Sequence, residues 1–192
     1  MASTVLPKTV KLVEVGPRDG LQNETRLLDL QTKIDFINQL SATGLQYIEA
    51  GSFVSPKAIP QLADSDAVFR GINRHAQICY AALVPNEKGL ERALRAGANA
   101  IGVFTAASET FCQKNINCSI SESLERFERV VRRALAEHLP VRAYISCVLG
   151  CPYEGHISNQ QVASIARQLH HMGCGEISLG DTIGVGTAGN IK

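Results

Sequence analysis

Residues 13–24 read Val13-Glu14-Val15-Gly16-Pro17-Arg18-Asp19-Gly20-Leu21-Gln22-Asn23-Glu24. The stretch joins the end of a short apolar run, residues 11–15, to a polar loop with two glycines, a proline and adjacent Arg and Asp side chains. A run of this length before turn-forming residues is typical of a β-strand. A helical pattern begins near Leu30, so the stretch lies at the turn of a strand–loop–helix unit.

The same strand–loop–helix unit recurs along the chain. We expect strands at residues 11–15, 45–49, 77–84, 100–105, 141–149 and 176–179. We expect helices at residues 30–40, 64–72, 86–96, 119–138 and 158–172, most of which carry apolar side chains every three or four positions. Asp29, Asn86 and either Ser119 or Ser121 are suitable N-caps, and Gly97 is a suitable helix stop.

The apolar runs indicate an α/β fold with a parallel sheet. They are nearly continuous instead of alternating, which is typical of strands covered on both faces. Strands that alternate with helices form right-handed βαβ units. Two architectures remain open on this count, because six strands can complete a doubly wound sheet, whereas a (β/α)₈ TIM barrel needs eight. No linker interrupts the units, so we expect residues 1–192 to form a single domain.

Composition excludes several classes of protein. Of the 192 residues, 45 % are hydrophobic and 19 % charged, as in a globular protein. The net charge is +1 and no basic stripe with aromatic residues occurs, so we expect no nucleic-acid partner. No run has the length of a membrane span, and residues 1–9 do not resemble a targeting segment, so we expect no membrane partner and a cytoplasmic location. The six cysteines form no C-x-x-C pair and are expected to be free.

Acidic side chains follow three of the expected strands. Asp19 follows the first, Glu49 ends the second, and Asp181 follows the sixth. In parallel α/β folds the carboxyl ends of the strands share one edge, where active sites are built. Carboxylates that meet there repel one another unless an arginine such as Arg18 or a cation neutralises them. The pattern therefore favours a hard divalent metal ion with oxygen ligands, although acids at these positions also commonly cap the following helices.

Three other features carry less weight. Residues 184–189 match G-x-G-x-x-G, but they follow the sixth strand and not the first, so we expect no dinucleotide there. Among the histidines only His156 lies in a loop near the expected site. Cys147 and Cys151 flank the end of the fifth expected strand, and we interpret them as packing residues.

Five separated stretches make the chain resemble the hydroxymethylglutaryl-CoA lyases, in the order found in that family: residues 13–24, 48–57, 114–119, 147–155 and 176–187. The resemblance runs from about Leu6 to the last residue and favours the barrel, of which this chain would supply about the first six βα units. It implies cleavage of 3-hydroxy-3-methylglutaryl-CoA to acetyl-CoA and acetoacetate, with an acyl-CoA substrate and Mg²⁺ or Mn²⁺ as cofactor.

The resemblance also implies roles for single residues. Asp19 matches a metal ligand of the family, and Arg18 matches the arginine that stabilises the thioester enolate. Glu49 and Asp181 match acids that line the site, with Glu14 behind them. Three further residues match polar positions near the carboxylate end of the substrate: Asn115, Ser178 and Thr182. The charge on a thioester oxygen formed by such a cleavage is stabilised by a preplaced guanidinium and a Lewis acid.

Two departures from the family pattern limit these expectations. The family's other metal ligands, a His-x-His pair and an Asn, and its catalytic Cys all match positions beyond Lys192, so we expect a C-terminally truncated barrel. Thr25 stands where some members carry a lysine that contacts CoA. We also expect a homodimer. The alternatives are a condensing enzyme related to isopropylmalate or homocitrate synthase, and a non-catalytic fragment.

Overall fold

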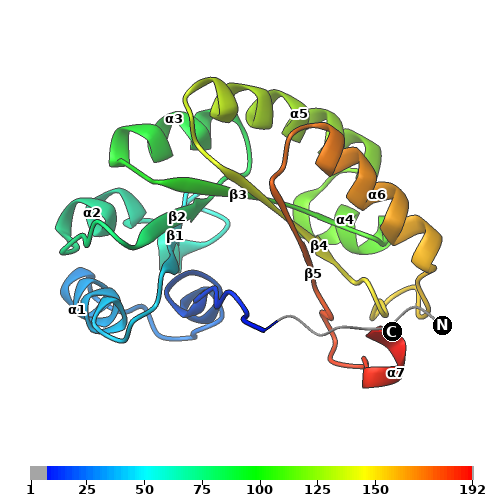
Figure 1. Ribbon diagram of the computed structural model, residues 1–192, viewed down its shortest axis with the longest axis horizontal. Coiled ribbons are helices and arrows are strands. Elements are labelled where there is room, and N and C mark those ends of the chain that lie inside the picture. Colours follow the sequence, from blue (N-terminus) through cyan, green and yellow to red (C-terminus); the bar gives the residue numbers. More distant parts are fainter. Residues whose placement is uncertain (1–7, 192) are drawn as a thin grey trace.

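A computed structural model describes residues 8–191 as a curved parallel sheet lined by helices (Figure 1). The sheet has five strands in the order β1-β2-β3-β4-β5, and every neighbouring pair is parallel. The strands are β1 (Tyr47–Ser52), β2 (Cys79–Leu83), β3 (Ala100–Ala106), β4 (Val141–Ser146) and β5 (Glu176–Leu179). Each strand therefore lies beside the strand that follows it in sequence.

This strand order distinguishes between the two architectures that the repeats leave open. A doubly wound sheet reverses direction at a switch point and places helices on both faces, whereas a barrel adds each strand on the same side. In Figure 1, α1, α2, α3, α5 and α6 form an arc around the outside of the curved sheet. The described part of the chain thus has the winding of a barrel wall.

The helices have clear starts and stops in the sequence. Their bounds are α1 (Leu30–Ser41), α2 (Ser65–Gly71), α3 (Glu87–Ala96), α4 (Glu109–Ile116), α5 (Ile120–Ala136), α6 (Asn159–His171) and α7 (Ala188–Ile191), with a π-helix η1 (Gly16–Gly20) and a 3₁₀-helix η2 (Pro60–Leu62). Asp29 and Asn86 cap α1 and α3 as predicted, and Ser119 rather than Ser121 caps α5. Gly97 ends α3 in the left-handed conformation, also as predicted.

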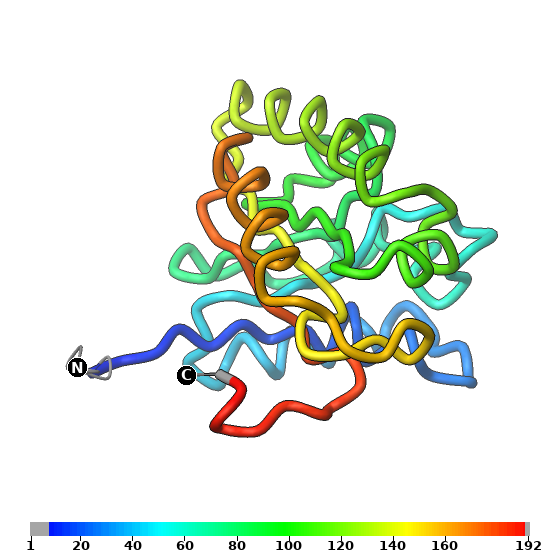
Figure 2. Tube along the Cα trace, turned by 90° about the vertical axis from the view of Figure 1, so that its right-hand side faces the viewer, coloured from blue at the N-terminus to red at the C-terminus, as the bar shows by residue number. Residues whose placement is uncertain are grey.

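The hydrophobic core has one large and one small part. The large cluster lies between the sheet and the helices and includes Ile48, Tyr80 and Ile101. The small cluster contains Tyr47, Ala81 and Ala100, each one residue away from a member of the large cluster. Because successive side chains of a strand point to opposite faces, the small cluster lies on the concave face of the sheet. Figure 2 shows α5 and α6 side by side over the convex face.

Two expectations about elements were wrong. The predicted first strand, residues 11–15, is reduced to a single parallel bridge between Glu14 and Ile48. The ladder cannot continue after it, because η1 begins at Gly16 and Pro17 has no N–H to donate. Helix α4 was not predicted, and it adds a second helix between β3 and β4. None of the helices within residues 8–191 is long and apolar enough to cross a membrane.

Candidate active site

The π-helix η1 places Arg18 and Asp19 beside β1, where Arg18 reaches Glu49. The backbone N–H groups of Arg18 and Asp19 both donate to the Val15 carbonyl, at 3.1 and 2.6 Å. The Glu14 carboxylate accepts the N–H of Gly16 at 2.5 Å and thereby fixes the entrance to the turn. Glu14 is thus tied to the backbone of the turn.

A buried ion pair forms the centre of the candidate site. Arg18 Nε donates to Glu49 Oε2 at 2.5 Å, and Arg18 Nη1 donates to Asp19 Oδ1 at 2.5 Å. The Glu49 side chain is completely buried and that of Arg18 is 10 % exposed, whereas Asp19 is 53 % exposed. One guanidinium therefore joins a buried carboxylate to one that faces solvent.

Tyr144 completes the surroundings of Glu49. Its hydroxyl donates to Glu49 Oε1 at 3.1 Å, and its ring lies 5.7 Å from the Arg18 guanidinium carbon. Both carboxylate oxygens of Glu49 thus accept a hydrogen bond. A side chain at Gly102 would occupy this space, since a Cβ there would lie 2.9 Å from Glu49 Oε1.

Burial and pairing act in opposite directions on these ionisable groups. Burial raises the pKa of Glu49, and the adjacent Arg18 offsets only part of that effect. Burial lowers the pKa of Arg18, but the Glu49 and Asp19 carboxylates outweigh it, so that its pKa lies above the ordinary value. Burial, followed by the charge of Glu49, raises the pKa of Tyr144. Arg18 therefore stays cationic and Tyr144 stays a hydrogen-bond donor at neutral pH.

The remaining site residues that the sequence predicts lie in or after β5 and on α4. Asp181 accepts the N–H groups of Val185 and Gly186 at 3.1 and 2.7 Å, so it caps the turn after β5. Thr182 Oγ1 accepts the N–H of Cys147 at 2.7 Å and links the ends of β4 and β5. Ser178 is in register with Tyr144 on the neighbouring strand. Asn115 is an exposed residue of α4.

Two of these residues, Asp181 and Asn115, make no hydrogen bond to Arg18 or Glu49 in the described part of the chain. Within residues 8–191, the hydrogen bonds of Asp181 go to its own loop and not to Arg18 or Glu49. Asn115 lies on the helix that sequence reasoning missed, with its side chain free of hydrogen bonds to other described residues. The structure therefore brings Arg18, Asp19 and Glu49 into direct contact, and leaves Asp181 in the loop after β5 and Asn115 on α4.

The donor set for a metal ion is incomplete in this part of the chain. Asp19 has the chemistry of a ligand for a hard divalent cation, because its carboxylate is half exposed and only Oδ1 is bonded to a described residue. The described residues contain no group of three His, Cys, Asp or Glu side chains that could hold an ion. Asp19 is therefore a single candidate ligand here, and Glu49 is sequestered by Arg18 and Tyr144.

Sequence reasoning missed Tyr144 and Gly102. Both lie inside strands, whereas the sequence pattern predicted site residues at strand ends and in the loops that follow. Tyr144 alternates with the buried residues Ala143 and Ile145, so its strand position placed it on the concave face together with Arg142. That alternation was the available signal. Nothing local in the sequence indicated that Gly102 makes room for a carboxylate.

Comparison with known proteins identifies relatives along almost the entire chain. A family model described as HMGL-like matches residues 9–192. The 3-hydroxy-3-methylglutaryl-CoA lyase named cytoplasmic from Rattus norvegicus is 57 % identical over 97 % of this chain and 54 % of its own length. The hydroxymethylglutaryl-CoA lyase named mitochondrial from Gallus gallus is 56 % identical over 97 % of this chain and 62 % of its own length.

Solved structures agree with the fold. The crystal structure of hydroxymethylglutaryl-CoA lyase from Pseudomonas aeruginosa matches 96 % of this chain with 60 % identity and a TM-score of 0.93, using 61 % of its own length. An HMG-CoA lyase from Acinetobacter baumannii, solved with coenzyme A and 3-methylmalate, matches 94 % of this chain and 60 % of its own with 41 % identity and a TM-score of 0.90. The chain thus spans about 60 % of the length of these structures. It belongs to the HMGL-like family, and its sheet is part of a (β/α)₈ barrel.

Proposed function

We propose that this protein cleaves 3-hydroxy-3-methylglutaryl-CoA to acetyl-CoA and acetoacetate. The observation that carries the proposal is the buried Arg18–Glu49 pair, which Tyr144 joins from β4, beside a half-exposed Asp19. An ionised arginine is costly to bury, and the Glu49 and Asp19 carboxylates offset that cost here, which keeps a guanidinium charge in place for a developing anion. The relatives with this fold are named lyases of this substrate.

The chemistry assigns Arg18 to the thioester. In the cleavage, the 3-hydroxyl loses its proton, the bond between carbons 2 and 3 breaks, and its electrons move onto the thioester as an enolate. The product acetoacetate carries the new ketone, and the enolate carbon takes a proton to give acetyl-CoA. Nε and Nη1 of Arg18 are held by Glu49 and Asp19, which leaves the Nη2 donors for the enolate oxygen. Hydrogen bonds aimed at such an oxyanion contribute most in a site that excludes water.

Glu49 and Tyr144 position this guanidinium. Glu49 fixes the Nε edge, and the Tyr144 hydroxyl fixes Glu49, so the direction of the free Nη2 group is set before the substrate arrives. Preorganised donors need no rearrangement during the reaction, which is the source of their effect. We propose that Asp181 lines the same site, and that Asn115, Ser178 and Thr182 lie near the carboxylate end of the substrate.

Members of this family depend on a divalent metal, and we propose Mg²⁺ or Mn²⁺ here with Asp19 as a ligand. When bound, the ion would act as a Lewis acid toward the substrate's hydroxyl and carbonyl oxygens. Asp19 contributes an oxygen to it, and Arg18 orients that carboxylate through Oδ1. We further propose a single barrel domain for residues 1–192, a cytoplasmic location and a homodimer, the last of which size-exclusion chromatography with light scattering would test.

The experiment uses the natural protein purified from its source. It is freed of metal, supplied with Mg²⁺ or Mn²⁺, and incubated with 3-hydroxy-3-methylglutaryl-CoA while acetoacetate and acetyl-CoA are quantified. Equal amounts of both products, dependent on metal, support the proposal. Condensation of acetyl-CoA with a 2-oxo acid in place of cleavage would instead indicate a condensing enzyme. Neither reaction, together with no stabilisation by Mn²⁺, would indicate a non-catalytic chain.

A further inference from the structure

The concave face of the sheet carries a second charged cluster, at the amino ends of β4 and β5. Arg142 Nη1 donates to Glu176 Oε2, and Lys11 Nζ donates to Glu176 Oε1. Arg142 and Glu176 are also in register on neighbouring strands. Lys11 lies in the segment before η1, and its Nζ is 4.4 Å from the centre of the Tyr47 ring. Two ion pairs therefore join that segment to β4 and β5, on the face that also carries the candidate site.

Stability alone does not explain why Arg142 is held here. The side chains of Lys11 and Glu176 are 47 % and 40 % exposed, and ion pairs this exposed contribute little to stability. The Arg142 side chain is 18 % exposed, and among the described residues its Nε is buried without a hydrogen-bond partner. A buried donor without a partner costs free energy. Another interaction must therefore account for the burial of this guanidinium.

That interaction is with the ring of Tyr144. Arg142 and Tyr144 are two positions apart on β4, so both side chains lie on the concave face. The Arg142 Cζ atom lies 5.3 Å from the ring centre, and the Arg18 Cζ atom lies 5.7 Å from it. Cations at this distance over an aromatic ring are attracted to it. One ring thus links the second charged cluster to the guanidinium of the candidate site.

The position of this ring sets the position of Glu49. The Tyr144 hydroxyl donates to Glu49 Oε1 at 3.1 Å. Beside the ring, Gly102 on β3 leaves little spare room, since a Cβ there would lie 3.0 Å from the ring and 2.9 Å from Glu49 Oε1. Gly102 is in register with Arg142, so the backbone of β3 limits the ring on one side and Arg142 limits it from the amino end of β4. A ring that moved would carry its hydroxyl away from Glu49.

We propose that Arg142 is a positioning residue that sets the direction of the Arg18 guanidinium. Arg142 holds the ring of Tyr144, and the Tyr144 hydroxyl fixes Glu49. Glu49 in turn fixes Nε of Arg18. Glu176 keeps Arg142 in place. This role rests on the proposed lyase function and deepens it, because a residue at the amino end of β4 would aim the donor that meets the enolate oxygen.

Steady-state kinetics of the natural protein and its variants test this role. Arg142→Met removes the cation and keeps most of the side-chain volume. We expect kcat for acetoacetate formation to fall by up to about 10²-fold, which a misplacement of about 1 Å can cost. An oxyanion donor acts in the transition state, so kcat and kcat/KM should fall together while KM changes little. Arg142→Lys keeps a cation over the ring and should recover most of the loss.

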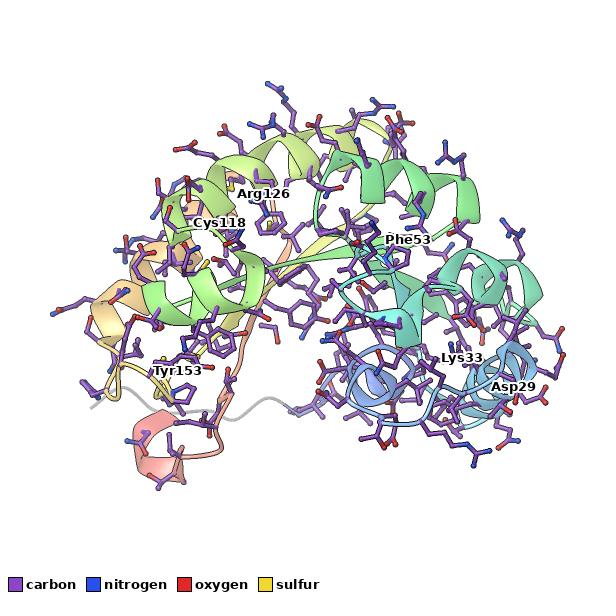
Figure 3. All side chains as sticks on the ribbon, turned by 180° about the vertical axis from the view of Figure 1, so that it is seen from behind. Asp29, Lys33, Phe53, Cys118, Arg126 and Tyr153 are labelled. Atoms are coloured by element: carbon purple, nitrogen blue, oxygen red, sulfur yellow. The ribbon has the colours of Figure 1, made fainter. Side chains whose placement is uncertain are left out.

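Arg92→Met is a matched control. Arg92 forms an ion pair with Asp66, and its Cζ lies 5.1 Å from the centre of the Phe53 ring, which Figure 3 labels. Phe53 belongs to the large core cluster between the sheet and the helices. The substitution therefore removes the same two kinds of contact without a link to Arg18. Its kcat should equal that of the wild type, even where both variants lose stability.

A double-mutant cycle shows whether Arg142 acts through Tyr144. Tyr144→Phe keeps the ring but removes the hydroxyl that reaches Glu49. In this background Arg142→Met should lower kcat by a smaller factor than in the wild type, because the link to Glu49 is already broken. Substitutions at residues that act through one another are not additive. Equal factors in the two backgrounds would overturn the role of Arg142.

The NMR signal of the Arg18 Nε–H group reports its bond to Glu49 without any turnover. Its loss in Arg18→Lys assigns it. We expect the signal to move in Arg142→Met, to return toward its wild-type position in Arg142→Lys, and to stay in place in Arg92→Met. A wild type that forms no acetoacetate would refute the lyase function alone, and this signal would still decide the role of Arg142. A signal that stays in place in Arg142→Met, or an active wild type with the same kcat as Arg142→Met, overturns that role.

Discussion

Arg18 Nε and Glu49 Oε2 lie 2.5 Å apart although 31 positions separate the two residues in sequence. The Glu49 side chain has no exposure to solvent. A buried charge pair of this kind is weak as a source of stability, because both ions lose their hydration. The pair instead holds the Arg18 guanidinium in one orientation. Through its second bond, Arg18 also orients the Asp19 carboxylate, which is half exposed to solvent.

Removing the cation from this pair should be strongly destabilising. In Arg18→Met the Glu49 carboxylate remains buried without its partner, and we expect a loss of about 3–5 kcal/mol in the free energy of unfolding. Urea denaturation of both proteins measures it. Glu49→Gln in the same background removes the orphaned charge and should recover part of the loss. A double variant no more stable than Arg18→Met would contradict the coupling between the two residues.

Replacing Tyr144 by phenylalanine should remove one hydrogen bond and little volume. Glu49 Oε1 then loses its donor, which for a bond to a charged group costs about 1.5–3 kcal/mol of stability. Tyr153→Phe is the matched control, because that side chain is exposed and should change stability little. Equal effects of the two substitutions would show that the Tyr144 hydroxyl does not support Glu49.

Gly102→Ala should disturb the same carboxylate from the opposite side. The added Cβ would lie 2.9 Å from Glu49 Oε1 and 3.0 Å from the Tyr144 ring. We expect a loss of about 1–3 kcal/mol, as is usual for overpacking. Gly20→Ala serves as the control because nothing lies within 4 Å of a Cβ there. Thermal unfolding of the two variants should differ, and a Gly102→Ala protein as stable as the control would contradict the tight fit.

The capping box of α5 should contribute an acid-sensitive part of the stability. Hydrogen bonds from the Ser119 backbone and hydroxyl lower the pKa of Glu122 below its ordinary 4.5. A group with a lowered folded-state pKa stabilises the protein above its unfolded-state pKa, and that contribution disappears as pH falls through the folded-state value. Glu122→Gln keeps a capping side chain that does not titrate. Its stability should fall less between pH 5 and 3 than that of the wild type, and parallel curves would contradict the role.

The order of elements could be predicted from sequence because it depends on local signals. Asp29, Asn86 and Ser119 mark helix starts by side-chain chemistry, and near-continuous apolar runs mark buried parallel strands. The loss of the first strand, predicted at residues 11–15, was not predictable from its apolar residues, because the exposure of Leu12 depends on the tertiary fold. Helix α4 begins at Glu109, with Ser108 as its N-cap, two residues after the end of β3. It was missed because the predicted pattern had only one helix after each strand.

The candidate site was predictable where its residues lie in loops after strands. Arg18 was identified in this way. Glu49 was identified because it was expected to end the second strand, and although β1 runs on to Ser52, the structure joins the two side chains. Tyr144 was missed because its contact with Glu49 links residues 95 positions apart, which no local periodicity reports. Asp181 was predicted as a site residue from its position after a strand. The same position also suits an acid that caps a turn, and in the described chain the hydrogen bonds of Asp181 are those of a cap.

The most direct test of the proposed lyase is the rate of acetoacetate formation from 3-hydroxy-3-methylglutaryl-CoA by the natural protein and its Arg18→Lys variant. Lysine keeps the positive charge but not the planar fork that holds Glu49 and Asp19 while a third donor stays free. Arg133→Lys, at an exposed pair with Glu137, is the control. We expect a fall in kcat of about 10²–10³-fold for Arg18→Lys, as for loss of an oxyanion donor, and none for the control. Equal rates in the two variants would contradict it.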